Sequence, residues 1–205
     1  MSDKYTTIEQ QASYGIGLQM GEQLAGNPFE GLDISAVQDG IATAFNKQPS
    51  AVSNEDMRVA FEQIHQRMQA AKEEQSKELV AAGAAFLAEN AKRDEVTVTD
   101  SGLQYEVINQ GEGDTPQANS TVKTHYHGTL IDGSVFDSSY ERGQPAEFPV
   151  GGVIKGWTEA LQLMPTGSKW RLYIPHDLAY GSQGAGAAIA PFSTLVFDIE
   201  LLEIL

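Results

Sequence analysis

The sequence has 205 residues, a net charge of −15 at neutral pH and no cysteine. Without cysteine, disulfides, thiol nucleophiles and thiolate metal ligands are excluded. The acidic balance, with no basic cluster, argues against nucleic-acid partners and anionic membranes. Residues 1–6 have neither the basic nor the apolar segment of a signal peptide, and no run is long enough to span a bilayer, so we expect a cytoplasmic protein. The length fits two units of about 90 and 110 residues.

The first part of the chain is predicted to be helical. Apolar residues recur every four positions from Ile8 to Leu24, which indicates an amphipathic helix despite three glycines. Each glycine costs about 1 kcal/mol relative to alanine in a helix interior. We therefore expect either that another backbone comes close to them or that they are solvated weak points. Asn27 and Pro28 break the chain, and residues 33–46 form a second helix.

A capping box that begins at Ser53 opens a much longer helix. Between Asp56 and Arg93 there is no proline and one glycine, Gly83, so the pattern predicts a helix of about 40 residues. Residues 72–78 interrupt its apolar seam with polar side chains. This polar stretch must therefore stand in water.

These patterns divide the chain into three parts. Residues 1–70 form a helical domain, residues 71–94 the exposed part of a long linker helix, and residues 95–205 a second domain. Two short helices and the start of a long one give only a small core. We therefore expect homodimerisation through residues 1–70, and a monomeric helical cap on the second domain is the alternative.

The second domain is predicted to be an antiparallel β-sheet wrapped around one short helix, which makes the whole chain an α+β protein. Alternating patterns predict strands over residues 122–131 and 169–174. The last strand covers residues 195–205, which are rich in apolar and β-branched side chains. Asp132-Gly133 is a strong hairpin signal after the first of these strands.

The short helix is expected before Pro165, within residues 150–164. One face of it would carry Val153, Trp157, Ala160, Leu161 and Met164. A helix start leaves backbone N–H groups near Val153 and Ile154 unpaired. The sheet wrapped around this helix would form a cup with a tryptophan at its bottom. Such a cup, with unpaired N–H groups beside it, is typical of a small apolar binding site.

The side chains that could face this cup are apolar or aromatic: Tyr126, Phe136, Phe148, Val153, Ile154, Trp157, Tyr180, Ile189 and Phe197. Asp137 is the carboxylate beside them, and Arg142 is either its ion-pair partner or a solvated loop residue. His125 and His127 have no further ligand at sensible spacing, which favours an exposed strand face over a metal site.

The candidate residues indicate binding rather than bond breaking. They contain no pair of nucleophile and base, no two-carboxylate arrangement and no metal set. We therefore expect no cofactor and no metal. A ligand that has an apolar ring with an attached carbonyl fits the cup.

Five motifs resemble, in order and spacing, those of the FKBP-type peptidyl-prolyl cis-trans isomerases. They are the run 122–130 around Tyr126, Val135-Phe136-Asp137-Ser138-Ser139, Val153-Ile154-Lys155-Gly156-Trp157, Leu178-Ala179-Tyr180-Gly181 and Thr194-Leu195-Val196-Phe197. The resemblance covers residues 95–205. The first half, with Ala12-Ser13-Tyr14-Gly15-Ile16-Gly17 before a long helix, is similar to the dimerisation region of the bacterial macrophage infectivity potentiator-like branch, in its 22-kDa cytoplasmic type.

The resemblance implies an isomerase that rotates Xaa-Pro peptide bonds. It further implies a V-shaped homodimer that assists folding, with chaperone-like binding of unfolded or folding proteins and inhibition by rapamycin-type macrolides. We assign catalytic roles to Tyr126, Phe136, Asp137, Ile154, Trp157, Tyr180 and Phe197, and substrate-binding roles to Phe148, Val153, Ile189 and Arg142. A non-catalytic chaperone or adaptor that uses the same cup is the alternative.

Overall fold

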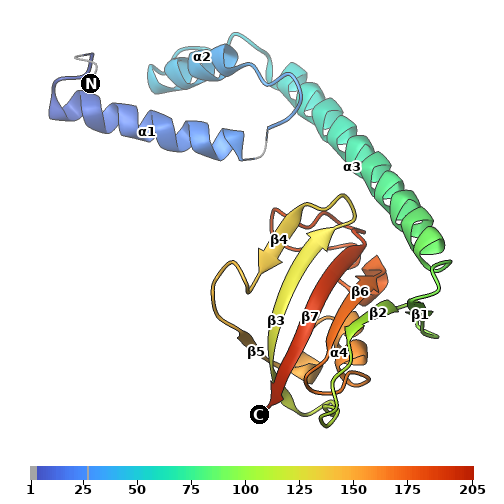
Figure 1. Ribbon diagram of the computed structural model, residues 1–205. Helices are drawn as coiled ribbons and strands as arrows, with labels where there is room; N and C mark the ends of the chain where they lie inside the picture. Colours follow the sequence, from blue (N-terminus) through green and yellow to red (C-terminus); the bar gives the residue numbers. More distant parts are fainter. Residues whose placement is uncertain (1–3, 27) are drawn as a thin grey trace. The chain divides into compact units, whose positions relative to one another are not determined.

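The computed structural model describes residues 4–26 and 28–205 (Figure 1). They form two compact units, divided between Lys72 and Glu73. The predicted break at Asn27, and residues 1–3 of the N-terminal segment, lie outside the described residues. Of the described helices, none combines the length and apolar character that crossing a membrane requires.

The first unit consists of helices that begin at polar capping residues. The helices are α1 (Ile8–Ala25), α2 (Ile34–Phe45) and the first part of α3 (Asn54–Asn90). At α1, Thr7 and Gln10 form a capping box. Asp33 caps α2, and the Ser53 hydroxyl accepts the N–H of Asp56 at 3.0 Å at the start of α3.

The two short helices have no buried residue in the described chain. Ile8 is 82% exposed, Phe45 87% and Phe61 70%. The space around the three glycines of α1 is open, because none of the described residues lies within 4 Å of a Cβ added at Gly15, Gly17 or Gly21. The expected close approach of a backbone is therefore not made within one copy of the chain.

The second unit is built on a seven-stranded antiparallel sheet in the order β1-β2-β6-β7-β3-β4, with β5 paired to β3 (Figure 1). The strands are β1 (Val96–Val98), β2 (Gln104–Asn109), β3 (Thr121–Leu130), β4 (Val135–Ser138), β5 (Ala146–Pro149), β6 (Lys169–Ile174) and β7 (Leu195–Ile204). The fold class and the three longest predicted strands are confirmed. Sequence analysis missed β1 and β5, which have three and four residues and are too short to show a period of two.

The central helix is shorter than its apolar spacing predicted. A 3-10 turn (Val150–Gly152) comes first, Val153 is extended at φ −104° and ψ 179°, and α4 covers only Lys155–Leu161. Val153 is a β-branched residue, which loses side-chain freedom in a helix. Met164 follows the helix in a tight turn, in which its N–H donates to Leu161, ahead of the proline at 165.

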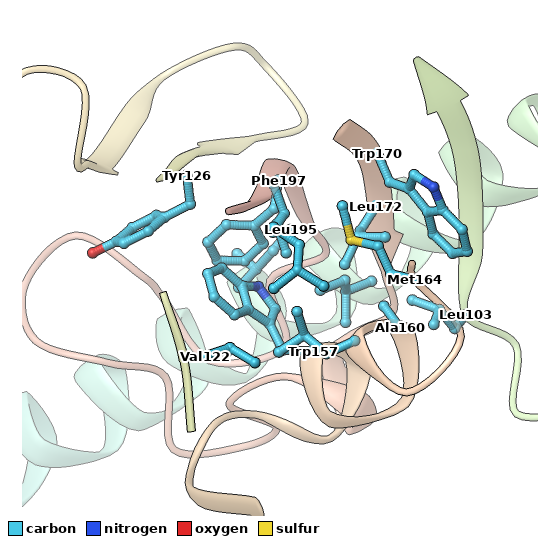
Figure 2. Close-up of a cluster of buried hydrophobic side chains, with 14 of the residues drawn as sticks. Leu103, Val122, Tyr126, Trp157, Ala160, Met164, Trp170, Leu172, Leu195 and Phe197 are labelled. Carbon is cyan, nitrogen blue, oxygen red and sulfur yellow. The ribbon is translucent and has the colours of Figure 1, made fainter. Parts of the chain in front are cut away.

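The core lies between the sheet and α4 (Figure 2). Trp157, Ala160 and Leu161 come from α4, and Met164 from the turn after it. The fully buried side chains from the strands and from the segments beside them include Leu103, Val122, Leu172, Ile174, Leu195, Ile199 and Leu201. Burying a side chain of this size stabilises the fold by about 1.5–3 kcal/mol.

The end of α3 belongs to this second unit, and most of residues 71–94 are exposed, as expected, although single positions are buried. Gly83 and Asn90 are buried, while most of residues 71–78 are exposed as expected. The Asn90 amide donates to the Gln104 side chain at 2.9 Å. The polar stretch of residues 72–78 is therefore largely solvent-exposed. The last three turns of α3 pack on the second unit, where Gly83 has no side chain to keep the helix away.

Candidate active site

A cavity of about 710 Å³ opens in the second unit. It is lined by all ten predicted cup residues: Tyr126, Phe136, Asp137, Phe148, Val153, Ile154, Trp157, Tyr180, Ile189 and Phe197. They come from β3, β4, β5, β7, α4 with the segment before it, and the loop between β6 and β7. Residues far apart in the sequence therefore form one surface.

The floor of the cavity is aromatic. Trp157 is 4% exposed, and its ring centroid lies 5.3 Å from that of Tyr126, 5.6 Å from Phe148 and 5.2 Å from Phe197. All three pairs meet edge to face, at 79–85° between ring planes, which is a favourable geometry for aromatic rings. Figure 2 shows Trp157 and Phe197 together, with the Tyr126 hydroxyl directed away from the buried cluster. The result is an apolar surface of ring size.

A glycine on β3 leaves room for one more ring, Phe136, beside Phe197 in this floor. A Cβ at Gly128 would come within 2.7 Å of the Phe136 ring and of the Phe197 ring. These two rings meet edge to face at 5.4 Å. Gly128 pairs with Asp137 across the β3–β4 hairpin, so the same register brings Phe136 and the carboxylate to the cavity.

Polar groups gather at one side of the cavity. The Tyr126 hydroxyl donates to the Asp137 carboxylate at 2.6 Å, and the Arg142 guanidinium donates to the Tyr126 oxygen at 2.6 Å and to Asp137. The ion pair is half exposed, with side-chain exposures of 44% for Arg142 and 42% for Asp137. Arg142 is therefore an ion-pair partner rather than a free loop residue, although it does not line the cavity.

The hydrogen bonds in this triangle determine the charge of its members. Burial raises the pKa of Asp137, but the bonds from Tyr126 and Arg142 outweigh it and hold the pKa below the ordinary value of 3.8. Burial and the Asp137 charge raise the pKa of Tyr126. At neutral pH the site thus contains a carboxylate whose oxygens already accept hydrogen bonds, and a protonated phenol.

We predict that Asp137 stays ionised throughout the range in which proteins function. Because folding lowers its pKa, ionised Asp137 stabilises the folded state at every pH above its ordinary value, and the contribution disappears as the pH falls through the lower folded-state pKa. A carboxyl-detected NMR titration should give a midpoint below 3.8 in the native protein. Arg142→Gln should raise the midpoint, and a native midpoint above 3.8 would contradict the described geometry.

Backbone geometry leaves one donor available at the rim. The N–H of Ile154, the residue before α4, makes no hydrogen bond within the described residues. Ile154 is extended, at φ −59° and ψ 151°, and lines the cavity. Tyr180 lies in the loop between β6 and β7 and is 39% exposed. A carbonyl that enters the cavity thus has two candidate donors, one backbone N–H and one phenol.

Sequence analysis missed four lining residues. They are Gly152, Ala185, Gly186 and Ala188. Small residues carry no periodic or chemical signal, so only the path of the backbone could reveal them. His125 and His127 also differ from the expected exposed face, because they are partly buried and bond Ser139 at 2.9 Å and Ser138 at 3.1 Å.

The described residues contain no group of three or more histidine, cysteine, aspartate or glutamate side chains that could hold a metal ion. The cavity combines an aromatic floor, a fixed carboxylate and available hydrogen-bond donors. Such a site is suited to holding an apolar ring with carbonyl groups on either side.

Two family models together match most of the chain. One, described as FKBP-type peptidyl-prolyl cis-trans isomerase, matches residues 112–202. The other, described as the domain amino terminal to FKBP-type peptidyl-prolyl isomerase, matches residues 9–107. The chain is 56% identical to the FKBP-type 22 kDa peptidyl-prolyl cis-trans isomerase of Escherichia coli, over 98% of both chains. It is 39% identical to the outer membrane protein MIP of Legionella longbeachae, over 97% of this chain and 87% of that protein.

Solved structures share the fold. The crystal structure of FkpA from Escherichia coli matches with a TM-score of 0.73 and 37% identity, over 98% of both chains. A peptidyl-prolyl cis-trans isomerase from Pseudomonas syringae matches with a TM-score of 0.59 and 43% identity, over 63% of this chain and 95% of that one. The chain belongs to the FKBP-type peptidyl-prolyl cis-trans isomerases. This confirms the predicted family and enzyme class.

Proposed function

We propose that the cavity binds the proline ring of an Xaa-Pro unit over Trp157 and lowers the barrier to rotation about the bond before it. The observation that carries this proposal is the closed aromatic floor, on which three rings meet the Trp157 ring within 5.6 Å. A saturated five-membered ring matches such a surface in size and polarity. The polar groups lie at the edge, where the flanking peptide units would pass.

The chemistry of rotation suits this site. An amide loses its resonance when it twists, and the barrier is about 18–20 kcal/mol. The planar unit has a dipole of about 3.5 D, and twisting lowers its charge separation, so a water-poor aromatic cavity favours the twisted form relative to the planar form. In this proposal the Ile154 N–H and the Tyr180 hydroxyl bind substrate carbonyls, while Phe148, Val153 and Ile189 provide apolar contacts. No bond has to break.

Asp137 has an electrostatic role in this proposal. Its carboxylate, held by Tyr126 and Arg142, would oppose the carbon of the twisting carbonyl rather than remove a proton. A lowered pKa supports this role, because a weak base is a poor proton acceptor.

We predict that Asp137→Asn lowers the isomerisation rate by less than about tenfold, since general-base catalysis typically contributes about 10²–10⁴-fold. The rate should be measured as cis–trans exchange of a Phe-Pro peptide by NMR. Asp132→Asn is the matched control, because Asp132 lies in the turn of the same hairpin and outside the cavity. A loss of a hundredfold or more in Asp137→Asn alone would contradict the electrostatic role.

We also propose that the helical unit pairs two copies of the chain and holds client proteins. The absence of buried residues in α1 and α2, among the residues that the structure describes, supports pairing, because apolar side chains such as Ile8 and Phe45 stay exposed in a single copy. The same proposal includes a V-shaped dimer, chaperone-like binding, inhibition by macrolides and a location in the cytoplasm. The competing function is a chaperone or adaptor that binds Xaa-Pro segments without turnover.

A further inference from the structure

One loop provides a large share of the cavity wall. Residues 175–194, here termed the cavity loop, connect the end of β6 to the start of β7. The lining residues that it contributes are Tyr180, Ala185, Gly186, Ala188 and Ile189. Substrate contacts on this side of the cavity therefore depend on where the loop is held.

Backbone hydrogen bonds within the cavity loop connect its two halves. Ala185 and Ile189 exchange backbone hydrogen bonds of 2.8 and 3.1 Å, and the Phe192 N–H donates to the Gly181 carbonyl at 2.8 Å. Phe192 adopts a positive φ of 63°, which is uncommon for a residue other than glycine. The ring of Phe192 also meets that of His176 at 5.3 Å. Because both ends of the loop are joined in this way, a shift at its base, where it meets β6 and β7, would also move the lining residues.

Helix α3 touches that base at one end. Gly83 is buried, and a Cβ added to it would collide with the Thr194 hydroxyl and lie 3.2 Å from the Thr194 Cβ. Thr194 is 5% exposed and is the last residue before β7. The helix backbone and the end of the cavity loop are thus in direct contact, with no side chain of α3 between them.

The same helix also contacts β6, the strand that leads into the loop. The Phe86 ring lies 6.0 Å from the ring of Tyr173, the residue before the last of β6. The Tyr173 hydroxyl accepts from Arg93 at 2.8 Å. The Gln104 amide donates to the Leu87 carbonyl at 2.9 Å. These contacts hold the helix end on β6 and β2, so its position against the loop is well determined.

We propose that residues 79–93 position the cavity loop for isomerisation, and that Gly83 is a positioning residue because the helix backbone reaches the loop there. The proposal rests on the cavity being the substrate site. Residues 1–72 are joined to this unit through α3, so a displacement of the helix would pass to the substrate contacts.

Gly83→Val tests the proposal in the full-length protein. The new side chain must displace Thr194, and misplacing a substrate-contacting group by about 1 Å can cost up to about 10²-fold. We expect kcat/KM for a Phe-Pro peptide to fall about tenfold, with shifted NMR signals for the amides of residues 185–190. Ala82→Val is the matched control, because it places the same side chain at an exposed position of the same helix. It should leave kcat/KM and the amide signals of residues 185–190 unchanged.

A rescue separates positioning from loss of structure. Gly83→Ala should give a smaller loss, about threefold, and adding Thr194→Ala, which removes the colliding hydroxyl, should restore the rate. Wild-type kcat/KM and unshifted loop amides in Gly83→Val would overturn the inference. If the cavity is not the substrate site, Trp157→Phe should leave the isomerisation rate unchanged, while the Gly83 variants should still shift the amide NMR signals of residues 185–190. This result would separate failure of the proposed function from failure of the positioning role.

Discussion

Trp157→Ala should abolish isomerisation of short Phe-Pro peptides and lower the free energy of unfolding by about 3–5 kcal/mol. The indole is 4% exposed and contacts three other rings, so its removal leaves a cavity in the core as well as a missing floor. The two effects have different causes. Removing the floor affects only catalysis, whereas the lost burial affects the fold.

Trp170 provides the matched control. It is also 4% exposed, stacks on Tyr105 at 4.4 Å and does not line the cavity. Trp170→Ala should lose a similar amount of stability yet retain the exchange rate in its folded fraction. Trp157→Phe and Trp170→Phe repeat the comparison with smaller cavities, in case the alanine variants do not fold. Equal losses of activity at both positions would show that stability, not the floor, controls the rate.

A fragment of residues 73–205 should isomerise short peptides within about twofold of the full-length rate and should be a monomer. All lining residues of the cavity belong to this unit, and the contacts of α3 with the cavity loop are retained. The cut comes before Gly83 for that reason. Residues 73–205 also form a compact unit by themselves.

The same fragment should lose its effect on a folding protein. If two cups held by a dimer act on one chain, the second binding event becomes intramolecular, and the full-length protein should accelerate proline-limited refolding about tenfold or more beyond the fragment. The full-length variant Ile16→Glu is the control, because Ile16 is 61% exposed on α1 and a charge there should separate the two copies. Equal acceleration by all three proteins would contradict a client-holding role for the helical unit.

Local patterns predicted most of the fold. The ten-residue strands β3 and β7 and the hairpin at Asp132-Gly133 follow from local residue patterns that need no tertiary knowledge. The helix near Trp157 was located correctly but bounded wrongly, because apolar spacing continued into residues that pack in the core without being helical. Very short strands such as β1 owe their pairing to neighbours, so no local signal marks them.

Some residues of the site could likewise be predicted from the sequence, and others could not. Aromatic residues and Asp137 have chemistry that a motif can reveal, and all the predicted lining residues meet at one cavity. Ala185, Gly186 and Ala188 contribute only backbone and small surfaces, which one sequence cannot distinguish from ordinary loop residues. The contact of Gly83 with Thr194 joins residues more than a hundred positions apart. It depends on how a helix end packs, so sequence analysis noted Gly83 only as the one glycine between Asp56 and Arg93.

The most direct test of the central claim is the cis-to-trans exchange rate of a short Phe-Pro peptide, measured by NMR with the full-length protein present. Uncatalysed exchange takes tens to hundreds of seconds, so acceleration is easily resolved. We predict acceleration that is lost in Trp157→Ala and retained in Trp170→Ala. Peptide binding at the cavity without any acceleration would contradict the isomerase account and support a non-catalytic adaptor.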